Sequence, residues 1–399
     1  MKAYKVKLAT PEDCTGCSSC MNACAKKCIS MDINKYGFLQ PSIDSTSCIG
    51  CRKCEKSCPI INIGKYDDNS SVIPDVYSAI LKNESDRYSS ASGGAFYAIA
   101  RYVIQRGGVV FGVRFDGVHV LHDYTESIEG LEAFRGSKYV QSEVGQSFNL
   151  VKNFLNQNRL VLFSGTPCQV AGLNHFLSKP YDNLITVQLI CRGTASPGVW
   201  EKHIRQQMTK SDIKDISNIR FRTKSTKYSS PVYSYVLRYD YKRNDNTEGE
   251  YWQHCRQDPY FSYFMNHNFR SSCLVCKFRN TYSTSADFTI GDAIGASSID
   301  SYGEKNISTI VAHNPKANDI LKDIEKELII TSQPLADLQT VYEDAIRIQA
   351  WDKRWRMWKV SNLLAMHVPL ENIGFIYKHY RPELFFYKTV RFLYRKILK

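Results

Sequence analysis

The chain has 399 residues, 43% of them hydrophobic, and a formal net charge of +13 at pH 7. This size and composition predict two or three globular units, and no apolar run approaches the roughly 20 residues needed to cross a bilayer. The first ten residues also lack the apolar core of a signal peptide, so we expect a cytoplasmic protein whose cysteines stay reduced.

Nine of the fourteen cysteines lie before residue 59, and eight of them form two runs, "CTGCSSCMNAC" and "CIGCRKCEKSC". Both runs have the spacing C-x2-C-x2-C-x3-C, in which three thiolates bind one 4Fe-4S cluster and the fourth reaches the other cluster. The predicted ligands are Cys14, Cys17, Cys20 and Cys58 for one cluster, and Cys48, Cys51, Cys54 and Cys24 for the other. A pair of zinc sites is the alternative, although zinc rarely uses this triple spacing.

These runs resemble those of two-cluster bacterial ferredoxins, except that Ala25 stands where proline usually follows the first run. Cys28 is left over, and we expect it to be a small buried side chain near a cluster. Residues 1–63 are therefore predicted to form a two-cluster ferredoxin-type domain, and the polar residues 64–75 a linker. Since each oxidised cluster with four thiolates carries about −2, part of the basic excess balances cofactors, and we expect no nucleic-acid partner.

A different composition follows the linker. Residues 90–108 predict a helix with a Ser/Gly start and a Gly-Gly stop, 109–116 and 118–125 predict paired strands, and 147–158 predict an amphipathic helix. Residues 159–165, 167–177 and 184–191 then read as strand, helix and strand. This βαβ unit predicts parallel strands joined by a right-handed crossover.

Two cysteines lie at the ends of those parallel strands. Cys168 follows the first strand and Cys191 ends the second, so both belong at the carboxyl edge, where α/β sheets place their sites. Alone, Cys168 fits a nucleophile, a metal ligand or neither. Cys273 and Cys276 form a CxxC pair, which by itself fits half a zinc knuckle, a redox dithiol or chance, and together the two pairs make four potential ligands. Cys255 has no assigned role beyond a buried free thiol.

Six segments, taken in order, resemble one family: "SSASGGAF", "GSKYVQS", "SGTPCQVAGL", "LICRGTASPGVW", "FRSSCLVCKFR" and "ADFTIGDAIG". From about residue 75 to about residue 330 the chain is similar to the beta subunits of factor-420 (deazaflavin) hydrogenases and dehydrogenases. The resemblance implies FAD and a third 4Fe-4S cluster, with the matching ligand positions Cys168, Cys191, Cys273 and Cys276. Arg192 replaces a histidine common in bacterial members, and the Gly-Trp that often follows "FRTK" is absent, so the resemblance does not fix the substrate.

The flavin is only weakly visible in the residues themselves, because no G-x-G-x-x-G motif occurs. Ser92, Gly93 and Gly94 open a helix whose free N–H groups can hold a pyrophosphate, and Lys138 in Gly136, Ser137, Lys138 and Tyr139 can serve as a phosphate cation. The alternative is an ordinary glycine start with an exposed lysine. Chemistry adds a reason, since clusters pass single electrons and a flavin converts them to two-electron reactions.

The fold class expected is α+β or α/β: a ferredoxin-like module joined to an α/β flavin domain at 76–330, with a helical C-terminal region at 331–399. In the last residues, a basic stripe opposite an apolar one fits either a membrane or partner contact or, as we expect, packing on the rest of the chain. We expect an oxidoreductase that passes electrons between a ferredoxin-like protein or deazaflavin and a small-molecule substrate, with Asp292 as a candidate polar group at the site. The alternatives are a non-catalytic electron-transfer subunit and a zinc-ribbon nucleic-acid binder.

Overall fold

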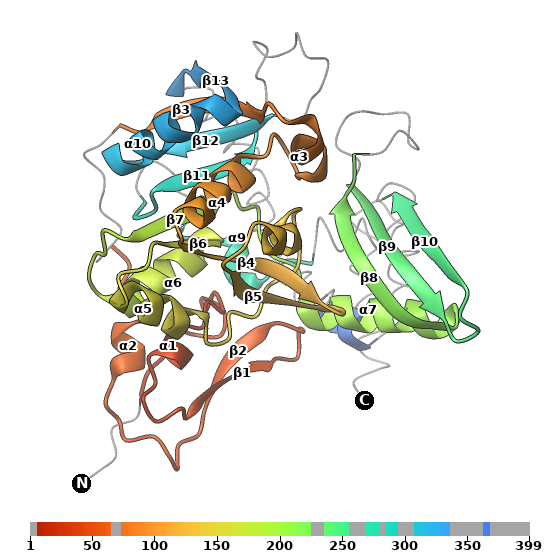
Figure 1. Cartoon of the computed structure of the whole chain (residues 1–399). Helices are drawn as coiled ribbons and strands as arrows, with labels where there is room; N and C mark the ends of the chain where they lie inside the picture. The colour runs from red at the N-terminus through yellow and green to blue at the C-terminus, as the bar shows by residue number, and fades with distance from the viewer. Residues whose placement is uncertain are drawn as a thin grey trace, which may run out of the picture.

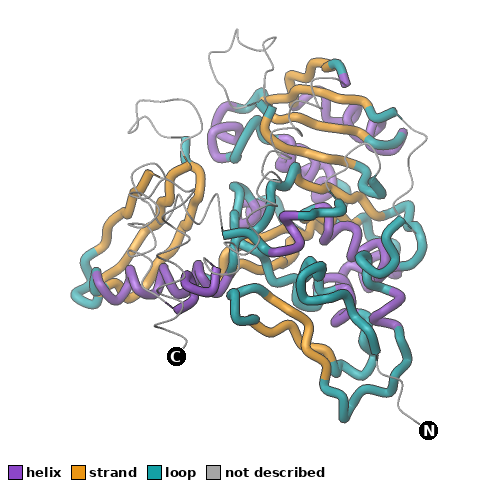
Figure 2. Tube along the Cα trace, turned by 180° about the vertical axis from the view of Figure 1, so that it is seen from behind, coloured by secondary structure: helices purple, strands orange, loops and turns teal. Residues whose placement is uncertain are grey.

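The computed structural model of the chain describes residues 6–64, 73–224, 235–254, 268–278, 284–293, 307–335 and 362–367. These residues form sheets of two, three and eight strands. The eight-stranded sheet is central, the N-terminal region lies at one end of it, and the three-stranded sheet stands to one side (Figure 1). The view from behind shows the same three parts (Figure 2). The chain is thus a mixed α/β protein with a small ferredoxin-like N-terminal region.

Two short helices and a hairpin build the N-terminal region: α1 (Ser19–Asn22), β1 (Ile29–Ile33), β2 (Leu39–Ile43) and α2 (Lys53–Lys56). β1 and β2 pair antiparallel. α1 follows Ser18 at φ 63°, and α2 follows Arg52 at φ 62°, both left-handed. Gly16 at φ 69° lies two residues before Ser18, and Gly50 at φ 67° lies two residues before Arg52, so both glycines are left-handed as well. The two cysteine runs therefore follow the same backbone course, and glycine accommodates a conformation that other residues rarely adopt.

The central sheet has the order β13-β3-β12-β11-β7-β6-β4-β5. Its strands are β3 (Asp75–Leu81), β4 (Val109–Asp116), β5 (His119–Thr125), β6 (Val161–Gly165), β7 (Leu184–Leu189), β11 (Phe288–Asp292), β12 (Ser308–Ala312) and β13 (Leu328–Gln333). The neighbours β4, β6, β7 and β11 run parallel, whereas β5, β12, β3 and β13 add antiparallel pairs. The predicted βαβ unit and the predicted pairing of β4 with β5 are confirmed.

Helices cover both faces of this sheet. They are α3 (Glu84–Ser89), α4 (Ala95–Gln105), α5 (Ser147–Asn156), α6 (Pro167–Leu177) and α10 (Pro315–Ile324), with short turns η1 (Glu129–Phe134), α9 (Ser271–Leu274) and η3 (Glu325–Glu327). α4 and α10 share one core cluster with Leu162 of β6, whereas α5 and α6 share another with Val161 and Phe163 of the same strand. Successive residues of β6 thus enter opposite cores, as expected for a strand buried on both faces.

The three-stranded sheet contains β8 (Ile213–Arg222), β9 (Tyr235–Arg243) and β10 (Glu248–His254), and α7 (Pro197–Lys210) packs against it. Trp200 of α7 is fully buried there, with its ring centroid 5.0 Å from that of Phe221 in β8. Its indole Nε1 donates to the backbone oxygen of Val118, 2.8 Å away, beside the β4–β5 hairpin. This contact ties the side sheet to the central one.

The expected C-terminal helical region differs from the structure at its start. β13 continues to Gln333, because residues 331–333 complete the antiparallel pairing with β3. Residues 362–367 are helical, and the basic segment 384–399 lies outside the described residues. Among the residues that the structure describes, no helix combines the length and apolar character needed to cross a bilayer.

Candidate iron–sulfur and flavin sites

The first ligand set predicted from the sequence comes together. Burial raises the pKa of the Cys17 thiol, and the nearby thiols of Cys58, Cys20 and Cys14 raise it further. The same causes act on Cys20, whose pKa is raised by burial and then by Cys14 and Cys58, with a smaller effect from Cys54. Mutual repulsion of this kind requires the four sulfur atoms to be neighbours, and it includes Cys58 from the second run. Cys58 of the second run thus lies near Cys14, Cys17 and Cys20 of the first run, as the predicted crossed pairing requires.

The second predicted set lines one small pocket. Cys24, Cys48, Cys51 and Cys54 border a cavity of about 20 Å³ near the surface, and Cys51 is exposed. Cys28 is buried and borders the same cavity, with its Sγ 3.3 Å from the Sγ of Cys24. The hydrogen bond with Cys24 is the main cause that raises the pKa of Cys28 to about 12, and burial adds to it.

A third group joins cysteines from three distant segments. Burial raises the pKa of Cys191, and the thiols of Cys273, Cys168 and Cys276 raise it further. Burial likewise raises the pKa of Cys168, as do Cys276 and Cys273, while a hydrogen bond with Thr166 lowers it. The Thr166 hydroxyl oxygen lies 3.2 Å from the Cys168 sulfur at the start of α6. The four cysteines that the resemblance implies as ligands thus lie together.

Zinc sites and 4Fe-4S sites differ in how closely their cysteine ligands must approach one another. Within the described ranges, no three His, Cys, Asp or Glu side chains converge tightly enough to hold one metal ion. A zinc site needs such convergence, because all four ligands bind the same atom. The four thiolates of a 4Fe-4S cluster bind four different iron atoms, so they surround the cluster at wider spacing.

The dicluster region is docked onto the central domain beside the third group. The buried Arg270 donates from Nε to the backbone oxygen of Cys14 at 2.6 Å and from Nη1 to that of Leu39 at 2.7 Å. Ser272 also donates to the Cys14 oxygen, at 3.1 Å. On the other side, a Cβ at Gly172 of α6 would lie 3.0 Å from the sulfur of Cys17. The absence of a side chain at Gly172 lets α6, one turn after Cys168, approach a ligand of the first set.

A cavity of about 190 Å³ lies at the carboxyl edge of the parallel strands. Thr166 and Gln169, which flank Cys168, line it, as do Leu189 and Thr194, which flank Cys191. Cys168 and Cys191 therefore lie within three residues of the cavity lining. Pockets for cofactors typically enclose about 300–1,000 Å³, so the enclosed part suits one portion of a dinucleotide.

Most of the residues predicted to bind the flavin line this cavity: Ser92, Gly94, Gly136, Ser137 and Lys138. Gly94 caps α4 at φ 96° without any side-chain hydrogen bond, so the positive end of this helix borders the cavity. Gly93 instead packs against β3, where a Cβ would lie 2.2 Å from the oxygen of Ala79. Tyr139 faces the side-sheet core, with its ring edge-to-face on Phe221 at a centroid distance of 6.1 Å.

Lys138 is the cavity cation whose charge no carboxylate of the described residues offsets within ion-pair distance. Its Nζ donates to the backbone oxygens of Ala133 at 2.9 Å and Arg135 at 2.8 Å. Burial of the ammonium group lowers the pKa of Lys138, and the Arg220 cation lowers it further. An anionic group beside Lys138 would relieve both effects, and together with the N-terminus of α4 this makes the cavity suited to a phosphate.

Residues 221–224 ("FRTK") hydrogen-bond to three segments beside the cavity. Arg222 donates from Nη1 to both oxygens of Asp292, at 2.9 and 2.8 Å, at the end of β11. Lys224 donates to the backbone oxygens of Arg87 at 2.6 Å and Ser92 at 2.8 Å. Asp292 does line the cavity, but its carboxylate is engaged with Arg222. We therefore regard Asp292 as a group that positions the wall.

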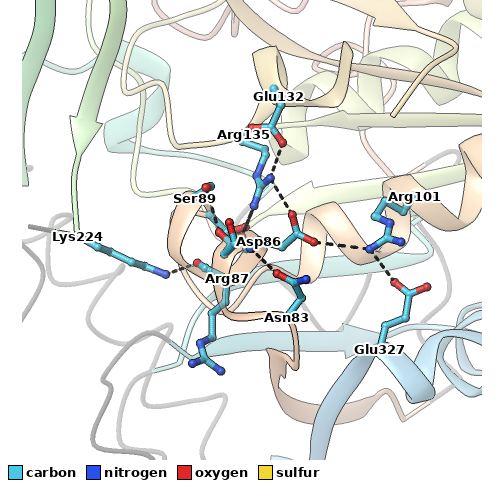
Figure 3. Close-up of polar contacts among 11 residues, drawn as sticks. Asn83, Asp86, Arg87, Ser89, Arg101, Glu132, Arg135, Lys224 and Glu327 are labelled. Carbon is cyan, nitrogen blue, oxygen red and sulfur yellow. Dashed lines mark hydrogen bonds and ion pairs between the residues drawn. The ribbon is translucent and has the colours of Figure 1, made fainter. Parts of the chain in front are cut away.

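A charged network fixes α3 beside the same cavity (Figure 3). Arg135 lines the cavity, and its guanidinium reaches the Asp86 carboxylate at 3.3 Å and also Glu132. Arg101 lies 3.7 Å from Asp86 and 3.6 Å from Glu327, which joins the network to the turn before β13. The Arg135 guanidinium also stacks over the Tyr97 ring at 4.0 Å.

A buried chain of polar side chains that the sequence did not predict reaches the cavity lining at Ser142, Ser164 and Gln169. His122 Nε2 donates to the backbone oxygen of Ser164 at 3.2 Å, so its Nδ1 accepts from the hydroxyl of Ser142 at 3.1 Å. Gln169 Nε2 donates to that hydroxyl oxygen at 3.0 Å, and its Oε1 accepts from the backbone of Thr166 at 2.9 Å. The spacing of Thr166 and Gln169 is that of a capping box, which was the available signal for this part.

An α/β domain with a cysteine group behind its cavity and a docked two-run cysteine module defines an iron–sulfur redox protein. Residues 13–61 match the 4Fe-4S dicluster domain, and residues 158–337 match the family described as the C terminus of the coenzyme F420 hydrogenase/dehydrogenase beta subunit. Residues 13–61 are thus similar to a domain that holds two 4Fe-4S clusters, and residues 158–337 are similar to the C-terminal domain of this beta-subunit family.

Among solved structures, the chain is similar to one chain of the xenon-derivatised F420-reducing [NiFe] hydrogenase complex from Methanosarcina barkeri. The TM-score is 0.46 and the identity 14%, over 72% of this chain and 93% of that chain. No curated protein matches the chain.

Proposed function

We propose that the chain is an iron–sulfur flavoprotein oxidoreductase, in which a third 4Fe-4S cluster links the dicluster domain to FAD bound in the cavity. The observation that carries this proposal is the position of the third cysteine group. Ser272 and Arg270, just before Cys273, hydrogen-bond to the backbone oxygen of Cys14, while neighbours of Cys168 and Cys191 line the cavity. These contacts support a position of the group between the dicluster domain and the cavity.

When bound, the clusters supply one-electron transfer, and a flavin supplies the exchange between one-electron and two-electron chemistry. The chain's own residues have distinct parts in this arrangement. Cys168, Cys191, Cys273 and Cys276 are the proposed cluster ligands, and Thr166 can donate a hydrogen bond to the Cys168 sulfur. The N-terminus of α4 and Lys138 face the cavity as the anion-binding elements for a diphosphate.

The proposed electron donor or acceptor is a ferredoxin-like protein or the deazaflavin coenzyme named by the matching family. Deazaflavin use is supported by that family match. The other partner is a small-molecule substrate that gains or loses two electrons.

A second candidate is a non-catalytic electron-transfer subunit of a larger redox complex. The family name, which describes a beta subunit of hydrogenases and dehydrogenases, favours it. Turnover of any small-molecule acceptor by the isolated chain favours the enzyme, whereas turnover only after addition of further subunits favours the non-catalytic role.

The test compares two single cysteine variants after anaerobic reconstitution. The wild-type chain should bind about 12 iron atoms, four for each of three clusters, and one FAD. Cys168→Ala should bind about eight. Cys28→Ala is the matched control, because it removes a cysteine beside Cys24 that is not a proposed ligand, and it should keep about 12.

Iron content, cluster EPR spectra and flavin content together decide the result. A wild-type ceiling near eight iron atoms, or an unchanged iron content in Cys168→Ala with lost activity, rejects the third cluster. The second result would instead identify Cys168 as a nucleophile.

A further inference from the structure

The two ligand sets of the dicluster domain differ in their access to solvent. Cys17 of the first set is buried against Gly172 of α6. In the second set Cys51 is exposed, and its neighbour Ile49 is 64% exposed although it is a large aliphatic residue. Both residues border the cavity enclosed by the second ligand set. The second cluster is therefore the one nearest to any molecule that approaches from outside.

The segments that carry the second ligand set are rich in exposed lysines. Lys26, Lys27, Lys53 and Lys56 are all exposed, and none forms an ion pair among the described residues. Lys26 and Arg52 also border the cavity. The carboxylate of Glu55 lies between these lysines in sequence, but it is buried, paired with Arg52 at 2.7 Å and hydrogen-bonded to the backbone of Lys7 at 2.8 Å.

We define the distal face as Lys26, Lys27, Ile49, Cys51, Lys53 and Lys56. Asp44 is the exposed carboxylate beside it, where the Asp44 amide donates to the Cys28 oxygen at 2.9 Å. An exposed apolar centre within a charged rim is the usual composition of an interface. A rim whose charges share one sign speeds the encounter with a partner of opposite charge and contributes less to the final affinity.

We propose that the distal face docks an acidic one-electron carrier protein. This inference rests on the proposed function and names the partner for the outer end of the electron path. The reaction moves one electron from the reduced carrier, which is oxidised by one electron, to the cluster held by Cys24, Cys48, Cys51 and Cys54, which is reduced by one. No bond forms or breaks and no proton moves. The contact should be small, weak and sensitive to salt, as electron-transfer interfaces are.

The experiment uses the cluster-loaded full chain and an acidic two-cluster bacterial ferredoxin as the probe. In the test variant, Lys53→Glu/Lys56→Glu, two charges of the distal face are reversed. Because Lys53 adjoins Cys54, a second test variant, Lys26→Glu/Lys56→Glu, leaves that position intact. The matched control, Lys214→Glu/Lys326→Glu, makes the same change in net charge at exposed lysines of β8 and η3.

Two readouts are measured at low and high salt: ferredoxin affinity by calorimetry with both proteins oxidised, and the rate of cluster reduction by reduced ferredoxin in stopped flow. Both test variants should lose about tenfold or more in the low-salt rate and affinity, with a smaller loss at high salt. The control should change by less than about twofold. Reduction by methyl viologen radical, a cation, should not be slowed in any variant.

Equal effects in test and control variants would show that only net charge matters and would overturn the proposal, as would unchanged ferredoxin kinetics in both test variants. Failure of the proposed function looks different. In that case ferredoxin still binds and reduces the dicluster domain, but the electrons do not reach the flavin. If only the docking proposal fails, viologen-reduced clusters still reduce the flavin.

Discussion

Arg270 links the dicluster domain to the rest of the chain, and its removal should separate them functionally. Its guanidinium makes four hydrogen bonds: 2.6 Å to the Cys14 oxygen, 2.7 Å to the Leu39 oxygen, 3.3 Å to Gln141 Oε1 and 3.0 Å to Gln40 Oε1. Arg270 is 2% exposed, so these hydrogen bonds are shielded from solvent in the folded chain.

The expected magnitude follows from two opposing effects. Each hydrogen bond from a charged donor contributes about 1.5–3 kcal/mol, and bonds from one side chain are not additive. Removing the guanidinium also removes the cost of burying its charge, which the described residues do not offset with a carboxylate within ion-pair distance. We therefore expect Arg270→Met to lower the free energy of unfolding by about 2–4 kcal/mol.

The assay compares matched anaerobic samples of Arg270→Met and Arg159→Met. Arg159 donates to the Gly107 oxygen and to Glu126, but its side chain is 32% exposed, so this control should lose less than about 1 kcal/mol. In Arg270→Met the dicluster EPR signals should persist while the rate of flavin reduction from those clusters falls. Wild-type stability together with a wild-type intramolecular rate would refute the assignment of Arg270 as the link.

Three further predictions concern single positions. Gly172→Ala gains helix propensity of up to about 1 kcal/mol, but it places a Cβ 3.0 Å from the Cys17 sulfur. Since overpacking costs about 1–3 kcal/mol, we expect a net loss of stability, seen as faster iron release from the dicluster domain. An unchanged release rate would show that α6 shifts to accommodate the added methyl group. Lys138→Met should retain less FAD after gel filtration without changing the iron content, and equal FAD retention would remove Lys138 from the site. Burial lowers the pKa of His122 to about 4, below its unfolded value near 6.5, so its contribution to stability is complete above pH 6.5 and is lost as the pH falls toward 4. Between pH 8 and pH 5 this loss is about 2 kcal/mol, and His122→Phe should show a correspondingly flatter pH dependence in denaturation measurements.

The sequence predicts those features that local patterns determine. The cysteine spacing predicted the dicluster domain, and the apolar run before Cys168 with its capping residues predicted β6, α6 and the parallel pairing with β7. Each of these depends on residues a few positions apart. The four cysteines predicted as the second ligand set border one pocket, together with Cys28, and their assignment as cluster ligands stays a prediction.

Long-range pairing could not be predicted in the same way. β3 lies between β12 and β13, so strands more than two hundred residues apart in the chain become neighbours, and no local pattern encodes that order. For the same reason the sequence did not predict the contact of Lys224, whose ammonium group donates to the backbone oxygen of Ser92. The helical region expected from residue 331 was wrong at its start, because strand residues there pair with β3 instead.

The proposed electron path requires the three cysteine groups to lie close to one another. Cys20 of the first ligand set is near enough to Cys54 of the second to raise its own pKa, and Cys17 acts in the same way on Cys168 of the third group. The three groups are therefore neighbours in one order, from the exposed Cys51 inward to the cavity wall. This order does not follow the chain. Cys58 of the second run is assigned to the first set, Cys24 of the first run is assigned to the second set, and the third set combines three distant segments. A flexibly attached dicluster domain would lose the contact between the first and third groups, so the buried Arg270 and the missing side chain of Gly172 are what the proposed electron path requires of this fold.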